Sequence, residues 1–200
     1  MNTAKTSSHE KVVKLVQTAF IAALIVVLQV ITYFVKIGPF NMSFVLIPIV
    51  VGGLLLGPKT GAFLGGVFGL VVTILSATGV DAGGFIVFTA NPVMCVILCM
   101  LKGILAGFVP AVVYKSMNKN KSNAASVWLA SMLSPILNTG VFCIGMYIFF
   151  YDVLQSWAGG TNVLIYTLTG LVGINFIIEF CLNLVLSPVI TKLILHQRKK

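Results

Sequence analysis

Long apolar runs, separated by short polar segments, make up most of the chain. The first run extends from about Leu15 to Val35, and a glycine-rich pair of runs from Phe44 to Ala77 is interrupted at Gly57-Pro58-Lys59. A helix needs roughly 20 predominantly apolar residues to cross the hydrocarbon core of a bilayer. The pattern therefore predicts an all-α, polytopic membrane protein with six transmembrane helices. The predicted spans are about 15–35, 44–57, 58–78, 92–114, 124–150 and 163–195.

The second predicted span is shorter than the others. Residues 44–56 would reach about 20 Å as a helix, whereas the hydrocarbon core is about 30 Å thick. A tilt, a local break, or a re-entrant hairpin with the third segment would each reconcile this length with the membrane. A re-entrant hairpin would leave four full spans and would keep both ends of the chain on the same side.

Composition leaves no room for a second, soluble domain. The 200 residues are 58% hydrophobic and 8% charged, with a mean hydropathy of +1.08, whereas about a quarter of the residues of a soluble domain are charged. We therefore expect residues 1–200 to form a single transmembrane domain, with 1–14 as a polar tail. The net charge of +9 does not indicate nucleic-acid binding, because the basic residues lie in connections and tails rather than on one folded face.

The basic residues predict the orientation of the chain. Almost all of those outside the spans fall on one side, opposite Lys36, Asp81 and Asp152, and cytoplasmic connections carry an excess of Lys and Arg. Both termini are therefore predicted to be cytoplasmic. The residues on the basic side are Lys5, Lys11, Lys14, Lys59, Lys115, Lys119, Lys121, Lys192, Arg198, Lys199 and Lys200.

The connections on the opposite side are the longer ones. They cover about 36–43, 78–91 and 151–162, and they include Asn41, Phe88 and Trp157. Polar and aromatic residues in long external connections favour a binding site that opens outward. For Trp157, an aromatic belt at the membrane surface is the alternative interpretation.

The sequence carries no recognisable catalytic, metal-binding or nucleotide-binding motif. The four cysteines, Cys95, Cys99, Cys143 and Cys181, lie inside apolar runs and have no accompanying histidine or second cysteine pair, so we expect neither disulfides nor a metal site. There is also no nucleophile with a matching base and no phosphate loop. We therefore expect no enzyme activity and no cofactor, and a pump would need partner chains to hydrolyse ATP.

Small residues recur at helical spacing in two places. Gly57, Gly61, Gly65 and Gly69 lie four residues apart on one helical face, and in lipid such faces allow close helix packing. Packing of the third span inside the protein is the interpretation we favour. Ala19 and Ala23, with an alanine between them, form a second small face in the cytoplasmic half of the first span, either for internal packing or for docking a partner.

Polar residues at membrane depth point to a binding site. Lys102 and Glu179 lie about 15 and 24 Å from the external side, and Asn138 and Asn175 about 18 Å. Ionisable groups at such depths are costly and usually functional. Lys102, Asn138, Asn175 and Glu179 are therefore the candidate binding residues, with Asn41, Phe88 and Trp157 as contributions from the loops. A structural ion pair of Lys102 with Glu179, and hydrogen bonds between helices made by the asparagines, are the alternatives.

The stretch Gly53–Ala62, continuing to Gly65 and Gly69, resembles the junction of the second and third helices in S components, the vitamin-binding membrane subunits of energy-coupling factor (ECF) transporters. The number of spans, the cytoplasmic termini and the alanine pair agree with this resemblance. It implies that Ala19 and Ala23 contact a transmembrane scaffold subunit, which two ATPase subunits drive. It also implies a substrate pocket in the outer half, formed by the last three helices and capped by the first, third and fifth loops.

The predicted site favours a ligand with a single carboxylate. Lys102 is a compact point charge, and the amides beside it suit hydroxyl or amide groups, so pantothenate is the expected vitamin. Folate is the closest rival, because its rings would stack on aromatic residues such as Phe88 or Trp157. A metal-ion S component is disfavoured, since the ligand-rich N-terminus that the resemblance would imply is missing.

Two other classes of protein remain open from the sequence alone. In a stand-alone carrier, Lys102 and Glu179 would exchange a proton during transport. Such carriers often contain internal repeats, and we find none, since the glycines of 57–69 have no evident counterpart after residue 100. A membrane-embedded assembly subunit without a ligand would leave the polar residues unexplained.

Overall fold

The computed structural model describes the backbone of residues 2–34, 36–37, 40–41, 44–118 and 124–197. The side chains of these residues are described except at 2–8, 33–34, 36–37, 40–41, 174–175, 187–188, 191, 193–195 and 197. Helices make up nearly all of the described chain. The exceptions include a small antiparallel pairing between β1 (Lys36–Ile37) and β2 (Phe40–Asn41).

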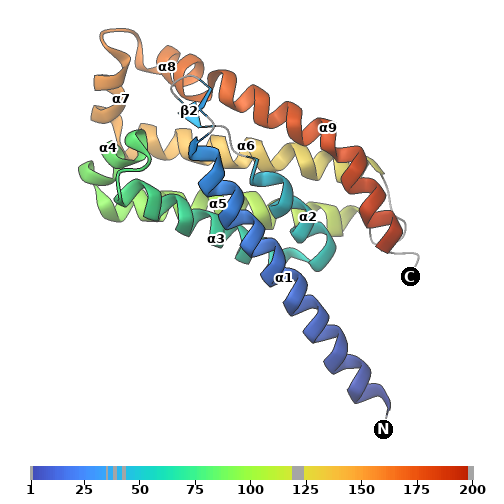
Figure 1. Ribbon diagram of the computed structural model, residues 1–200. Helices are drawn as coiled ribbons and strands as arrows, with labels where there is room; N and C mark the ends of the chain where they lie inside the picture. Colours follow the sequence, from blue (N-terminus) through green and yellow to red (C-terminus); the bar gives the residue numbers. More distant parts are fainter. Residues whose placement is uncertain (1, 35, 38–39, 42–43, 119–123, 198–200) are drawn as a thin grey trace.

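The helices form a bundle from which the first one projects (Figure 1). In chain order they are α1 (Asn2–Phe34), α2 (Leu46–Leu56), α3 (Pro58–Ala77), α4 (Ala82–Ala90), α5 (Pro92–Met117), α6 (Ala124–Phe149), α7 (Tyr151–Ala158), α8 (Val163–Tyr166), the π-helical segment η1 (Thr167–Val172) and α9 (Gly173–Gln197).

The structure supports the helical membrane architecture but not the full count of six spans. In the part of the chain that the structure describes, four helical stretches are long and apolar enough to cross a membrane: His9–Thr32, Pro58–Ala77, Pro92–Met117 and Ala124–Phe149. A fifth span results if Val163–Val172 and Phe176–Leu186, which meet at a bend of 42°, are counted as one.

Helix α2 is the predicted span that falls short. Its 11 residues correspond to about 16 Å of helix, about half the thickness of the hydrocarbon core. The chain turns at Gly57, whose φ of 101° suits glycine, and Pro58 begins α3, a position where its missing N–H costs nothing. Helix α2 consequently packs against α3 and α5 as a short internal element.

Glycines join α3 to α5 along their length. A Cβ added at Gly65 would collide with the backbone carbonyl of Gly103, and one added at Gly61 with that of Gly107. At Gly69 it would lie 2.6 Å from the carbonyl oxygen of Cys99. The prediction that the third span packs inside the protein is confirmed. On α5, Gly103 and Gly107 supply the facing surface.

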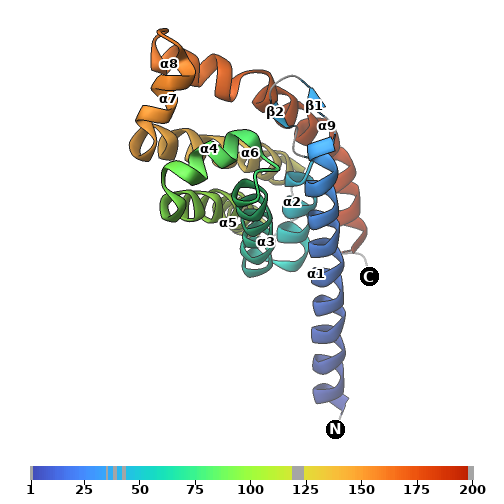
Figure 2. The ribbon, with the colours of Figure 1, turned by 60° about the vertical axis from the view of Figure 1, so that its left-hand side comes forward.

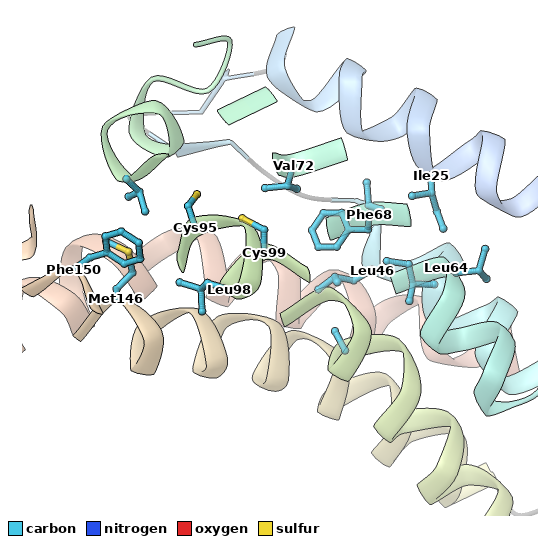
Figure 3. Close-up of a cluster of buried hydrophobic side chains, with 14 of the residues drawn as sticks. Ile25, Leu46, Leu64, Phe68, Val72, Cys95, Leu98, Cys99, Met146 and Phe150 are labelled. Carbon is cyan, nitrogen blue, oxygen red and sulfur yellow. The ribbon is translucent and has the colours of Figure 1, made fainter. Parts of the chain in front are cut away.

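The core lies where α2, α3, α5 and α6 meet (Figure 3). Its fully buried side chains include Leu46, Leu64 and Met146, and Ile25 is contributed by α1. Partly buried side chains such as Phe88 and Trp157 pack against this cluster from the short helices.

Two connections that we expected to be loops contain helices. Helix α4 forms within the predicted connection 78–91 and α7 within 151–162. A left-handed Gly79 precedes α4, and the left-handed Gly159 and Gly160 end α7. Both helices lie at the same end of the bundle (Figure 1, Figure 2).

Helix α1 is longer and more exposed than we predicted. It is helical from Asn2, so the expected polar tail continues the helix, and its first half projects beyond the other helices (Figure 2). Large apolar side chains on it are exposed, with Phe20 at 71% and Val27 at 53% of their surface. Side chains of this kind are suited to lipid or to a membrane partner.

Candidate substrate-binding site

A cavity of about 220 Å³ lies between helices at the end of the bundle that carries α4 and α7. Side chains from α1, α3, α4, α5, α6, α7, η1 and α9 line it. The polar or charged ones are Gln29, Thr32, Ser76, Asp81, Lys102, Asn138, Thr139 and Glu179, and the large apolar ones include Phe68, Val72, Leu98, Phe142, Trp157, Leu171 and Phe176. Predicted site residues from four different helices thus meet at one cavity.

Lys102 brings a positive charge to the cavity wall. It lies on α5, one helical turn after Cys99 and one turn before Ala106, and its side chain is half-buried. The ammonium nitrogen Nζ is 4.7 Å from the centre of the Phe142 ring and 5.9 Å from that of Phe68. Aromatic faces stabilise a cation by their quadrupole, yet they accept no strong hydrogen bond. They hold the ammonium at the cavity while leaving its N–H groups suited to an anionic ligand.

Asn138 faces the cavity from α6. Its side chain is 8% exposed, and within the described part of the chain its Oδ1 atom has no hydrogen-bond partner. One turn earlier, the Ser134 hydroxyl donates a hydrogen bond of 2.9 Å to the carbonyl of Ala106 on α5. This bond joins α6 to α5 beside the cavity, so that the Asn138 amide lies opposite the helix that carries Lys102.

Glu179 reaches the same cavity from α9. Its side chain is buried, with 6% of its surface exposed, and it lines the cavity. Asn183, one turn further along, donates from Nδ2 to the backbone carbonyl of Glu179 at 2.9 Å and does not line the cavity. Glu179 therefore lies at the cavity, whereas Asn183 is bonded within its own helix. The side chain of Asn175 lies outside the described residues.

The loop contributions that we predicted have different outcomes. Trp157 lines the cavity from α7. Phe88 packs against the hydrophobic core instead, while its neighbour Val87 lines the cavity from α4. The side chain of Asn41 lies outside the described residues, although its backbone forms part of β2.

Several cavity residues were missed from the sequence. Gln29 and Thr32 reach the cavity from α1, and Ser76, Asp81 and Thr139 from other elements. We had expected the last three helices to form the pocket, so α1 and α3 were not considered as its walls. Gln29 carried a signal, because it is a polar residue inside the apolar stretch Ile21–Ile31.

The predicted docking residues lie away from the cavity. Ala19 and Ala23 are both exposed on α1, near the middle of this helix. We gave two interpretations of this pair, internal packing and docking of a partner. Because both side chains are exposed, they do not pack inside the protein. Their small side chains leave the helix backbone accessible to another helix.

A second hollow lies at the opposite end of α3 and α5. It measures about 920 Å³, is wide open, and is lined by Lys14, Lys59 and Lys115 together with apolar side chains such as Leu55 and Phe108. The cavity that contains Lys102 therefore occupies the half of the bundle away from this basic end. We predicted the basic end to be cytoplasmic, which would place the cavity in the outer half.

Comparison with known proteins identifies the class. The sequence model of a family described as the ECF transporter substrate-specific component matches residues 13–191. The chain therefore belongs to the family of substrate-specific components of ECF transporters, a family of membrane transport proteins rather than of enzymes. A similar protein is the pantothenic acid transporter PanT of Lactococcus lactis subsp. cremoris (strain MG1363), which is 28% identical over 189 residues, covering 87% of this chain and 91% of PanT.

Proposed function

We propose that this chain captures pantothenate from outside the cell and delivers it for ATP-driven uptake by partner subunits. The observation that carries the proposal is the cavity, because it combines the Lys102 ammonium, the Asn138 amide and a cover provided by Trp157. Pantothenate presents one carboxylate, one amide and two hydroxyl groups to such a wall. The similarity to PanT, named for pantothenic acid, supports the same ligand.

The size of the cavity favours pantothenate over folate. Pockets for drug-sized ligands measure about 300–1,000 Å³, and the cavity measures about 220 Å³. Folate, with its fused ring system, benzoyl group and second carboxylate, belongs to that larger class, whereas pantothenate is a short, flexible acid. The Lys102 charge would pair with its carboxylate, and amides such as Asn138 would bind its polar groups.

Transport would depend on other chains, because the sequence contains no nucleotide-binding motif. We propose a transmembrane scaffold subunit and two ATPase subunits of an ECF module as the partners, with Ala19 and Ala23 as the docking face on α1. Exposure of both alanines and the projection of α1 from the bundle support this assignment.

Native mass spectrometry of the purified chain against a panel of water-soluble vitamins tests the proposal. We expect retention of the mass of pantothenate in preference to folate, riboflavin, biotin and thiamine. Uptake into proteoliposomes should then require the co-reconstituted scaffold subunit and the two ATPase subunits. It should also require ATP on the side of the membrane where the ATPase subunits lie. Retention of folate instead of pantothenate would identify folate as the substrate. Uptake by the isolated chain, driven by a proton gradient, would instead support the stand-alone carrier.

A further inference from the structure

Gln29 on α1 is an unexpected member of the cavity wall. Most of its neighbours on the helix face outward, among them Val26, Val27 and Val30. Gln29 itself is 4% exposed, and with Ile25 one turn earlier it belongs to the inward-facing stripe of α1. A polar side chain on an otherwise apolar span has been turned into the bundle rather than toward lipid.

The amide oxygen of Gln29 lacks an internal hydrogen-bond partner. Oε1 is buried, and within the described part of the chain no group donates a hydrogen bond to it. Thr32, the other α1 side chain at the cavity, differs in this respect, because its hydroxyl donates to the carbonyl of Leu28 at 2.7 Å. Buried acceptors without a donor are rare in native structures and cost stability. Such a group beside a cavity is suited to accept a hydrogen bond from the molecule that fills it.

Asn138 presents a second acceptor of the same kind. Its Oδ1 is also buried without a partner in the described chain, and it lines the same cavity from α6. Two amide oxygens and the Lys102 ammonium together match a ligand that carries both an anionic group and hydrogen-bond donors. A simple fatty or aromatic acid would satisfy Lys102 alone and leave both oxygens buried and unpaired.

We propose that Gln29 determines specificity by accepting a hydrogen bond from a hydroxyl or amide N–H group of the bound vitamin. This inference rests on the proposed function, and it assigns to α1 a role in substrate selection. It also means that one helix contacts the ligand at Gln29 and carries the candidate docking residue Ala23 six positions earlier, about 9 Å along its axis.

The decisive variant is Gln29→Met, which keeps the approximate volume of the side chain and removes its amide. Gln17→Met is the matched control, because Gln17 lies three turns earlier on α1 and does not line the cavity. Affinities are measured calorimetrically for pantothenate and for N-(3,3-dimethylbutanoyl)-β-alanine. This analogue keeps the carboxylate, the amide and the methyl groups of pantothenate and lacks both hydroxyls.

We expect Gln29→Met to weaken pantothenate binding by about tenfold or more, the effect of losing one hydrogen bond. The affinity for the analogue should change by less than about threefold if a hydroxyl is the donor. The ligand-free variant should melt at the same temperature as the wild type or above it, because an acceptor without a partner has been replaced by an apolar group. Gln17→Met should leave both affinities unchanged.

Other outcomes would overturn the inference. An unchanged affinity for pantothenate would exclude Gln29 as a contact. Equal weakening of both ligands with a lower melting temperature would assign Gln29 a structural role. If Gln29→Met does not fold, Gln29→Leu is measured in the same way. If neither variant folds, Gln29 is structural.

The proposed function can fail separately. If the wild type binds a different vitamin from the panel, the assignment of pantothenate as the substrate is wrong. Gln29→Met is then tested with that vitamin. A ligand without hydroxyl or amide donors, such as nicotinate, would overturn the inference as well, and binding of no vitamin would overturn both proposals.

Discussion

At the scale of single residues, the proposed function assigns to Lys102 the charge that would pair with the carboxylate of the vitamin. We expect Lys102→Met to weaken pantothenate binding by roughly ten- to a hundredfold, because a hydrogen bond to a charged group contributes about 1.5–3 kcal/mol. The fold should survive, since the ammonium contacts aromatic rings that a methionine side chain would also contact. Titration calorimetry in detergent measures the affinity, and thermal denaturation measures the stability.

Lys115→Met is the control for this change, because Lys115 lies on the same helix at the opposite, basic end and outside the cavity. It should leave the affinity as it is. An unchanged affinity for Lys102→Met would remove that residue from the site. Loss of the folded protein would favour the structural ion pair with Glu179.

Residues that line the cavity could be predicted from the sequence where ionisable or amide groups interrupt long apolar runs. Lys102, Asn138 and Glu179 were identified in this way, and the structure brings all three to one cavity. Gln29 was missed although it interrupts a run in the same manner. The sequence does not show which face of α1 points inward. The depth of Gln29 in the membrane also does not predict that α1 shares a cavity with the last three helices.

At the scale of helices, the contact between α3 and α5 depends on the absence of side chains. A Cβ at residue 65 would lie 2.7 Å from the carbonyl carbon of Gly103, which belongs to rigid helix backbone. We therefore expect Gly65→Ala to push the two helices apart and to lower the free energy of unfolding by about 1–3 kcal/mol. Thermal or denaturant-induced unfolding in detergent measures the change.

The neighbouring glycine provides a matched control. A Cβ at Gly66 would lie 3.7 Å from the Cγ1 atom of Ile104, which is an ordinary contact. Gly66→Ala should leave stability unchanged or raise it, because alanine favours a helix over glycine by up to about 1 kcal/mol. Equal effects of the two substitutions would mean that close backbone packing does not hold α3 and α5 together.

Helix α7 lines the cavity with Trp157, one of the two tryptophans in the chain, and under the proposed function it would cover the ligand. In a Trp128→Phe variant, whose fluorescence comes from Trp157 alone, pantothenate should still shift or quench the emission, because the ligand alters the surroundings of the ring. In Trp157→Phe the change should disappear. Calorimetry on the same samples establishes binding, and binding without any change in Trp157 emission would contradict the role of α7 as a cover.

Periodicity and length predicted the long helices but not the short ones. The runs that became α3, α5 and α6 were identified with boundaries close to those observed, because each has the length and hydropathy of a span. The sequence predicts loops at α4 and α7, since nine and eight residues are too few to carry a clear helical pattern. Their formation depends on packing against the ends of neighbouring helices, which a local pattern does not contain.

At the scale of the whole molecule, the two ends of the bundle differ in chemistry. The cavity with Lys102 and Glu179 lies at the end covered by α4 and α7, while the wide hollow at the other end is lined by Lys14, Lys59 and Lys115. Under the proposed function, the cavity would collect the ligand on one side of the membrane. The energy for transport would come from partners that meet the chain within the bilayer or at the basic side.

Helix α1 connects these two requirements, and a bulky substitution on it should separate binding from transport. We expect Ala23→Trp to abolish ATP-driven uptake in proteoliposomes while leaving pantothenate binding to the isolated chain unchanged. The indole would block a close approach of a partner helix to this small face, and it would lie outside the cavity. Ile144→Trp is the control, because Ile144 is also exposed, at 61% of its surface, and lies on α6, a different helix from the docking face. Its uptake should match that of the wild type.

Persistent uptake by Ala23→Trp would show that the partner docks elsewhere. Loss of pantothenate binding together with uptake would mean that the substitution disturbs the position of α1 and, through it, the cavity wall at Gln29.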